Sequence, residues 1–214
     1  MVILSEKNSL INQFLSELRS VTIQQDSLRF RRNMERIGEI IAYELSKELD
    51  YAKTNVTTPL AKTSINLLQE QPVLASILRA GLPFHQGFLN YFDKAENAFI
   101  ASYRNNNGDK SFEIKTDYVA SPDLDGKTLI IADPMLATGK SLCEAYRFLE
   151  KFGKPKRLFI ASIIASREGI TNIQKNLPMA ELYLAAVDEE MNSRKYIIPG
   201  LGDAGDLAFG ERKK

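Results

Sequence analysis

One segment of the sequence constrains the fold more than any other: an apolar run, residues 127–132, that ends in the carboxylate Asp133 and passes through a short loop into a predicted helix. Thr138, Gly139 and Ser141 stand at the end of that loop. At the start of a helix, unpaired backbone N–H groups and the positive end of the helix dipole face the same point, which favours an anion. Gly139 would let the backbone approach a phosphate, and Asp133 would reach ligand hydroxyls at the sheet edge. An ordinary strand–turn–helix with Ser141 as N-cap fits the same residues.

The rest of the chain alternates apolar strands with amphipathic helices. Strands are predicted over 73–78, 98–103, 127–132, 158–165 and 182–187, and helices over 83–92, 141–152 and 168–176. Before them, helices are predicted over 9–18 and 26–49, with Asp26 as a cap, and short strands within 51–70. This order indicates an α/β fold with a mainly parallel central sheet and flanking helices, in a single domain over 1–214.

Gly139-Lys140-Ser141 also matches the end of the ATPase phosphate loop, G-x-x-x-x-G-K-[ST]. The first glycine of that loop would be residue 134, which is Pro134 and has no backbone N–H to offer a phosphate. The sequence therefore argues against an ATPase or kinase.

Two further segments carry residues suited to anions or flat ligands. Arg79 closes the predicted strand 73–78 just before Gly81, and an arginine there can hold a phosphate with two hydrogen bonds, although a surface arginine at a turn fits equally. The segment 196–206 contains G-x-G-x-x-G, but only nine residues follow Gly205, which excludes a dinucleotide-binding unit. Its glycines would let backbone groups read the edge of a small planar ligand; the alternative is a tight C-terminal turn.

Asp133-Pro-Met-Leu-Ala-Thr-Gly139 resembles the phosphoribosyl-pyrophosphate signature of uracil phosphoribosyltransferases. Ile77–Gly81, Tyr103-Arg104 and Tyr196–Asp206 are similar to other segments of that family, so the resemblance extends from about Val73 to Gly210. It implies a phosphoribosyltransferase-like fold with a helical N-terminal region and a small C-terminal base-binding hood. It also implies a glycosyltransferase that converts uracil and 5-phosphoribosyl 1-pyrophosphate (PRPP) to UMP and pyrophosphate in pyrimidine salvage.

The resemblance also implies residue roles. Asp133, Arg104 and Asp203 are expected to be catalytic. The residues expected to bind PRPP are Arg79, Arg104, Asp133, Pro134, Met135, Leu136, Ala137, Thr138, Gly139, Lys140, Ser141 and Asp203. Those expected to bind uracil are Tyr196, Ile197, Gly202, Asp203 and Ala204. The implied reaction is direct displacement at ribose C1 through an oxocarbenium-like transition state, with Mg²⁺ bound mainly through the pyrophosphate of the substrate and no metal site made by the protein itself.

The sequence departs from the family at four positions. Lys140 stands where the family usually has a small residue, and Arg167 stands where it usually has a proline. Lys195 replaces a common glycine, and Leu207 replaces a common charged residue. Lys140 can face either a phosphate or solvent, and we favour solvent. It is also the feature that could favour the alternative function, a non-catalytic ligand-sensing regulator that kept the pocket.

The composition of the chain limits which kinds of partner and location we expect for it. The formal net charge of +1 gives no reason to expect nucleic acid, and no apolar run approaches the roughly 20 residues of a membrane span. The single cysteine, Cys143, excludes an intrachain disulfide and fits a cytoplasmic protein; we expect it to be a buried thiol. His85, the single histidine, is expected to pack or face solvent. The resemblance implies a homo-oligomer, a dimer or higher.

Overall fold

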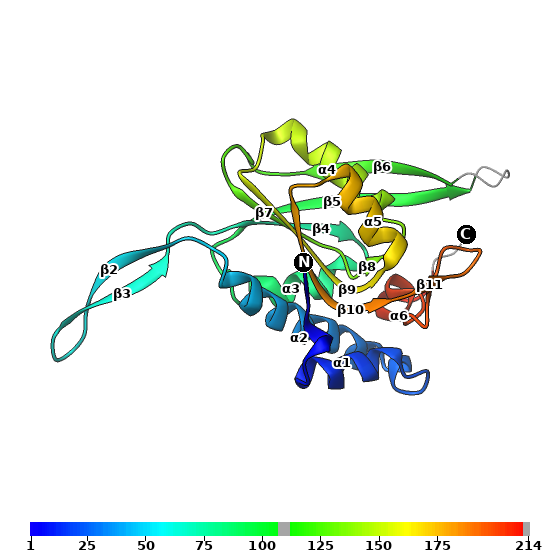
Figure 1. The fold of residues 1–214 in the computed structure, drawn as a ribbon, viewed down its shortest axis with the longest axis horizontal. Coiled ribbons are helices and arrows are strands. Elements are labelled where there is room, and N and C mark those ends of the chain that lie inside the picture. The colour runs from blue at the N-terminus through cyan, green and yellow to red at the C-terminus, as the bar shows by residue number, and fades with distance from the viewer. Residues whose placement is uncertain (107–111, 212–214) are drawn as a thin grey trace.

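A mainly parallel sheet forms the centre of the molecule (Figure 1). The structure is a computed structural model that describes residues 1–106 and 112–211, with side chains left out of the description over 102–106 and 112–117. Within the described residues the sheet has eight strands. Seven follow the order β1 (Val2–Ile3), β10 (Ala180–Asp188), β9 (Arg157–Ser166), β7 (Thr128–Ala132), β4 (Val73–Leu78), β5 (Glu96–Asn106) and β6 (Phe112–Ala120). The short β8 (Met135–Leu136) pairs with β9.

The pairing explains the apolar strands of the sequence. Every adjacent pair in the sheet is parallel except β5–β6, which is antiparallel. β7 is buried along its whole length, and β4 and β9 are buried except at one end. Strands covered on both faces carry continuous apolar side chains, so the expectation of a mainly parallel sheet is confirmed.

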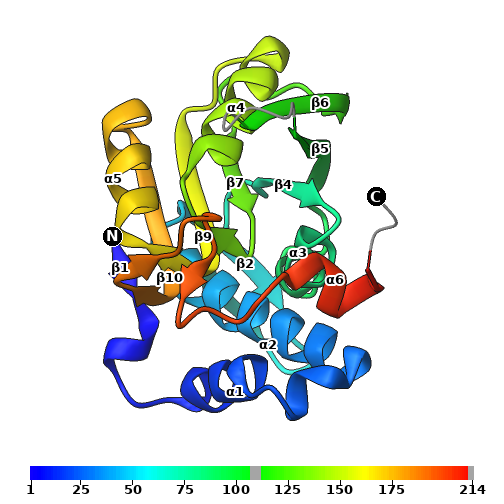
Figure 2. The same ribbon diagram turned by 90° about the vertical axis from the view of Figure 1, so that its right-hand side faces the viewer.

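Helices cover both faces of the sheet (Figure 2). On one face lie α1 (Leu10–Arg19), α2 (Ser27–Ser46) and α3 (Gly81–Leu89); on the other lie α4 (Lys140–Leu149) and α5 (Arg167–Asn176). Short 3₁₀ turns occupy Leu4–Glu6, Ile23–Gln25 and Glu150–Phe152. Asp26 caps α2 as predicted, because its carboxylate accepts the N–H groups of Leu28 and Arg29 at 3.0 and 3.1 Å.

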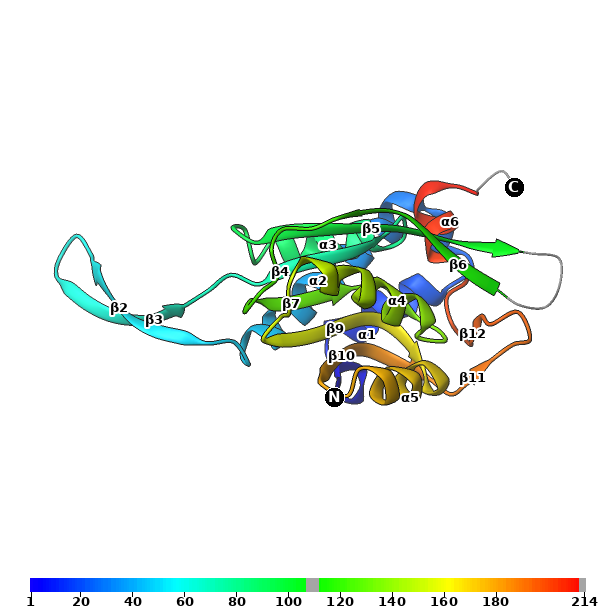
Figure 3. The same ribbon diagram turned by 90° about the horizontal axis from the view of Figure 1, so that it is seen from above.

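A two-stranded hairpin projects from the body of the molecule (Figures 1 and 3). It consists of β2 (Tyr51–Thr57) and β3 (Lys62–Leu68), which pair only with each other in the described part of the chain. The short strands predicted within 51–70 are thus confirmed, but their extension away from the sheet was not predicted.

The C-terminal segment lies at the carboxyl edge of the parallel strands (Figure 1). It comprises β11 (Glu190–Met191), β12 (Ile197–Ile198) and α6 (Ala204–Phe209). α6 is held against α2, since Arg31 donates to the carbonyl of Ala208 at 2.6 Å and its guanidinium lies over the Phe209 ring. This arrangement gives the predicted hood its position above the sheet edge.

Several boundaries differ from the sequence prediction. The helix expected to begin at Ser141 begins at Lys140 with Gly139 as its N-cap residue, so the alternative of Ser141 as N-cap is wrong. β1 and β6 were not predicted. The strand predicted over 98–103 runs from Glu96 to Asn106, and residues 107–111 lie outside the described residues. None of the described helices combines the length and apolarity that crossing a membrane requires.

Candidate functional site

The central loop, residues 133–139, is the first component of the site. It leaves the end of β7 and is fixed to β9: the Asp133 N–H donates to Ala161 O at 3.1 Å, and Pro134 O accepts the N–H groups of Ile163 and Ile164 at 3.1 and 3.0 Å. The loop and the start of α4 enclose a cavity of about 20 Å³. Its lining residues are Asp133, Met135, Leu136, Ala137, Thr138, Gly139, Ser141 and Leu142, so seven of the nine loop and helix residues expected to bind PRPP surround one point.

Gly139 occupies a position that excludes a side chain. Its φ is 73°, in the left-handed region that favours glycine. A Cβ built there would lie 3.0 Å from Gly169 O and 3.2 Å from the Asn172 Nδ2. The loop therefore leads directly into α4, whose first amides have no intrahelical hydrogen-bond partner; that of Lys140 donates to Thr138 Oγ1 at 3.4 Å.

α5 braces the loop from outside, which the sequence reasoning missed. Ser166 caps α5 by accepting the Gly169 N–H at 2.9 Å, and its hydroxyl donates to Ala137 O at 2.6 Å. Asn172 donates to Thr138 O at 2.8 Å. A Cβ on Gly169 would come within 2.4 Å of Ala137 O. The signal that could have found this brace is a serine at the end of an apolar strand followed three residues later by glycine.

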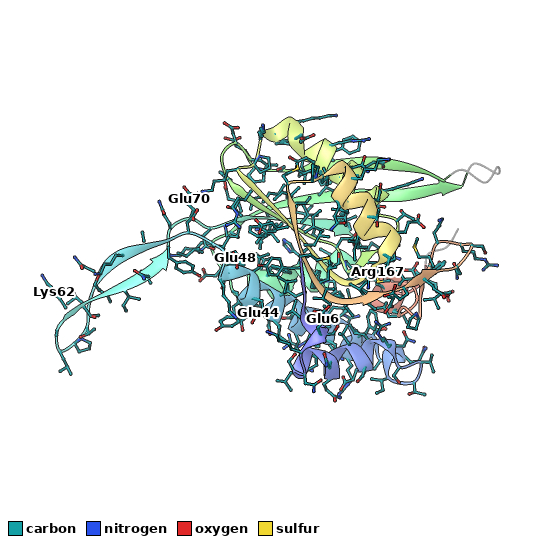
Figure 4. The ribbon with its side chains drawn as sticks, in the orientation of Figure 1. Glu6, Glu44, Glu48, Lys62, Glu70 and Arg167 are labelled. Atoms are coloured by element: carbon teal, nitrogen blue, oxygen red, sulfur yellow. The ribbon has the colours of Figure 1, made fainter. Side chains whose placement is uncertain are left out.

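Lys140 points away from the central cavity. Its side chain is exposed and lies on an outer groove of about 410 Å³, shared with Arg167, Thr171 and Lys175. Arg167, labelled in Figure 4, forms an ion pair with Glu189 at 3.0 Å. The geometry agrees with our preference for a solvent-facing Lys140, and a contact between Lys140 and PRPP stays a prediction.

Arg79 joins the central sheet to the C-terminal segment. It follows β4 directly, after a cis Leu78–Arg79 peptide bond, and its Nη2 lies 2.9 Å from Asp206 Oδ1 in α6. Its Nη1 donates to Gly210 O at 3.3 Å, while its buried Nε has no hydrogen-bond partner among the described residues. The predicted contact with pyrophosphate is untested, but an arginine with a spare donor stands at the sheet edge. Arg104 lies in β5 opposite Ile114, and its side chain is outside the described residues.

The C-terminal turn, residues 196–204, is the third component. Gly200 and Gly202 have φ values of 58° and 92°, so two of the three motif glycines need the left-handed region. Asp203 accepts the N–H groups of Gly205 and Asp206, both at 3.0 Å, and caps α6. Gly202 and Asp203 are exposed and Ala204 is buried. Tyr196 is exposed, whereas the Ile197 side chain is in the core, so any contact of Ile197 with a base would use its backbone.

The single cysteine and the single histidine both lie inside the protein. Cys143 is buried in α4, as predicted, and burial raises the pKa of its thiol. His85 is buried in α3, and burial lowers the pKa of its imidazole despite a hydrogen bond with Asn97. Both shifts favour the neutral forms, which suits packing more than catalysis.

Comparisons with known proteins match this geometry along the whole chain. A sequence model of the family described as uracil phosphoribosyltransferase matches residues 5–211. A protein named uracil phosphoribosyltransferase from Porphyromonas gingivalis is 52% identical over 210 residues, covering 98% of this chain and 97% of that protein. One of the same name from Pyrococcus furiosus is 37% identical, covering 98% and 90%. A solved structure of a protein from Aquifex aeolicus superposes with a TM-score of 0.87 at 32% identity, covering 98% and 97%.

The resemblance read from residues 73–210 thus extends across both ends of the chain, including the N-terminal helices that the motifs did not reach. The phosphoribosyltransferase-like fold expected from the sequence is confirmed, and the chain belongs to the uracil phosphoribosyltransferase family.

Proposed function

We propose that this chain transfers the 5-phosphoribosyl group of PRPP to uracil and releases UMP and pyrophosphate, as an enzyme of pyrimidine salvage. The observation that carries the proposal is the meeting of three distant segments at one sheet edge. The central loop, Arg79 and the C-terminal turn are separated by more than 50 residues each in the sequence, yet Arg79 and Asp206 are 2.9 Å apart. Donor and acceptor sites placed side by side are what a group transfer needs.

In this proposal, the start of α4 and the hydroxyls of Thr138 and Ser141 hold the 5′-phosphate of the donor. Asp133 holds the ribose hydroxyls from the end of β7. The C1–oxygen bond to pyrophosphate breaks as the bond from uracil N1 to C1 forms, and the N1 proton is released. Arg79 and Arg104 stabilise the charge that grows on the leaving pyrophosphate, and backbone groups of residues 202–204 read the edge of uracil.

Mg²⁺ is proposed as the metal, delivered by the substrate. Among residues 1–106 and 112–211, no group of three or more His, Cys, Asp or Glu side chains could hold a metal ion. Mg²⁺ prefers oxygen ligands and commonly takes several from substrate phosphates, so this chain fits an ion that pyrophosphate oxygens carry in. When bound, the ion supplies neutralising charge for the leaving group.

The test is product formation with each nucleobase. Protein, Mg²⁺ and PRPP are mixed with uracil, cytosine, adenine or guanine, and nucleotides are separated by chromatography. Uracil should give UMP, whereas cytosine should react about tenfold to a hundredfold more slowly, since its amino group reverses one donor–acceptor pair and an unpaired buried polar group costs about 1–3 kcal/mol. Equal rates with cytosine or a purine would defeat the proposal. Donor binding without any product would point instead to the non-catalytic sensor.

We also propose a homo-oligomer that covers the β2–β3 hairpin. The hairpin exposes Leu60, Ile65 and Leu67 to water, and a two-stranded sheet is at best marginally stable alone. Lys62 projects from the part of the hairpin far from the body (Figure 4). Sedimentation velocity should show the unmodified chain larger than a monomer and a Leu60→Glu, Ile65→Glu double variant smaller. Leu10→Glu, at an exposed apolar position on α1, is the matched control and should leave the size unchanged.

A cytoplasmic location is proposed on chemical grounds. Cys143 is buried and unpaired, and a chain without a disulfide is suited to a reducing compartment. Fractionation of the native host followed by immunodetection would test it.

A further inference from the structure

A single ion pair holds both backbone polar groups of Gly200 in the C-terminal turn. The Gly200 N–H donates to Asp188 Oδ2 at 2.9 Å, and Gly200 O accepts from Arg19 Nη1 at 2.9 Å. Arg19 also binds the carboxylate with two nitrogens, each at 2.8 Å. The turn is therefore fixed at one residue from two sides.

The two side chains of this ion pair come from different layers of the fold. Asp188 is the last residue of β10 and its side chain is only 6% exposed; Arg19 is the last residue of α1 and is 25% exposed. A bidentate arginine–carboxylate pair fixes orientation as well as distance. Replacing Arg19 would leave the buried Asp188 carboxylate without its partner, which is costly. The pair is thus a rigid support between the sheet, α1 and the turn.

This support divides the glycine motif into two functions. The Gly200 N–H already donates to Asp188 and its C=O already accepts from Arg19, so both groups serve to hold the turn. Gly202 is exposed, and among the described residues a Cβ there would have only Leu207 Cδ1 within 4 Å. Residues 201–204 continue directly from Gly200, so the direction in which they leave it depends on how Gly200 is held.

We infer that Arg19 and Asp188 are positioning residues for base recognition: they orient the backbone of residues 201–204 without touching the base. This inference rests on the proposed function, in which that backbone reads uracil. It predicts that disrupting the ion pair weakens the binding of uracil but leaves the binding of PRPP unchanged, because the central loop is braced separately by α5.

The chain offers a matched control on the same helix. Glu17 of α1 forms a second bidentate ion pair, with Arg29 of α2 at 2.8 and 2.9 Å, and among the described residues no hydrogen bond or ion pair joins either of them to the turn. Arg19→Lys keeps the charge but loses the planar fork that reaches both Asp188 and Gly200. Arg29→Lys makes the same chemical change to the other pair.

Steady-state kinetics then separate a positioning role from a structural one. Arg19→Lys should raise the KM for uracil about tenfold, equivalent to about 1.4 kcal/mol, with the KM for PRPP within about twofold. Arg29→Lys should leave both constants within about twofold. A uracil KM unchanged in Arg19→Lys, or equal rises in both constants, would overturn the inference.

Amide hydrogen exchange gives a second readout that needs no activity. In Arg19→Lys and in Asp188→Asn, the Gly200 amide, which donates to Asp188, should exchange at least about tenfold faster than in the unmodified chain, while the amides of residues 133–143 should not change. Arg29→Lys should leave the Gly200 amide protected. Unchanged exchange at Gly200 would refute the positioning role, even if the chain proved to make no UMP; faster exchange in an inactive chain would refute only the proposed function.

Discussion

Replacing Gly139 by alanine should damage both stability and donor binding, and a second glycine isolates the cause. Gly126 has a nearly equal φ of 67°, but no atom of the described residues lies within 4 Å of a Cβ built there, whereas a Cβ on Gly139, at 73°, would meet Gly169 O at 3.0 Å and the Asn172 amide at 3.2 Å. Left-handed backbone costs a non-glycine residue about 1–2 kcal/mol, partly offset by about 0.4–1 kcal/mol from a less flexible unfolded chain. Gly126→Ala should therefore cost between about 0 and 1.6 kcal/mol.

In Gly139→Ala the same strain is joined by crowding against α5, which adds about 1–3 kcal/mol. For a chain of this size, 1 kcal/mol lowers Tm by about 2–4 °C, so Gly139→Ala should melt roughly 2–12 °C below Gly126→Ala in calorimetry. If the loop shifts to relieve the contact, the first amides of α4 move as well, and the KM for PRPP should rise about tenfold or more. Equal melting temperatures for the two variants, together with an unchanged KM for PRPP, would refute the reasoning.

Three other perturbations test separate parts of the structure. Arg79→Ala should raise the KM for PRPP about tenfold to a hundredfold, since a charged hydrogen bond contributes about 1.5–3 kcal/mol. Asp206→Ala breaks the same ion pair but should leave the KM for PRPP unchanged. Similar kinetics for the two variants would contradict a contact between Arg79 and PRPP. Lys140→Gly should change the KM for PRPP less than about twofold because its charge is screened by solvent, and a tenfold rise at unchanged Tm would place it in the phosphate site. Hydrogen bonds from Arg29, Asn33 and Gln13 lower the pKa of the buried Glu17 to about 2, below its usual 4.5. The ionised carboxylate should therefore contribute about 1–3 kcal/mol to the free energy of unfolding above pH 4.5, and this contribution should be lost as the pH falls towards 2. Urea unfolding at pH 6 and pH 3 should show this loss in the unmodified chain and a smaller one in Glu17→Gln.

Local sequence determined much of the donor side of the site. The strand 127–132, the loop from Asp133 and the helix after Gly139 are consecutive in the chain, so their periodicity and one glycine were enough to predict a strand–loop–helix turn within one residue of the observed boundary. The family resemblance then gave the substrate. What sequence could not give was the brace from α5, since hydrogen bonds such as Asn172 to Thr138 depend on how β9 and α5 pack beside the loop.

The edges of the fold were harder to predict for a physical reason. β1 is only two residues long, and Val2 and Ile3 become a strand because Tyr183 and Leu184 of β10 offer them an open edge. In the sequence, β6 alternates apolar and charged residues, Phe112 to Lys115, unlike the continuous apolar runs of the parallel strands, and it pairs antiparallel with β5. The ion pair between Arg79 and Asp206 joins residues 127 positions apart, and no local pattern in the sequence encodes it.

The Arg19–Gly200 contact has a consequence for the order in which the two halves of the site can form. The hydrogen bonds that brace the central loop span 29 and 34 residues, whereas the one between Arg19 and Gly200 spans 181. Closing the longer loop costs about 1.5 kcal/mol more chain entropy than closing the 34-residue one. The central loop and its brace can therefore fold from a contiguous stretch of chain, whereas the C-terminal turn is fixed only when α1 meets it. Under mild denaturation the order reverses: detachment of α1 should release the C-terminal turn while the central loop is still intact.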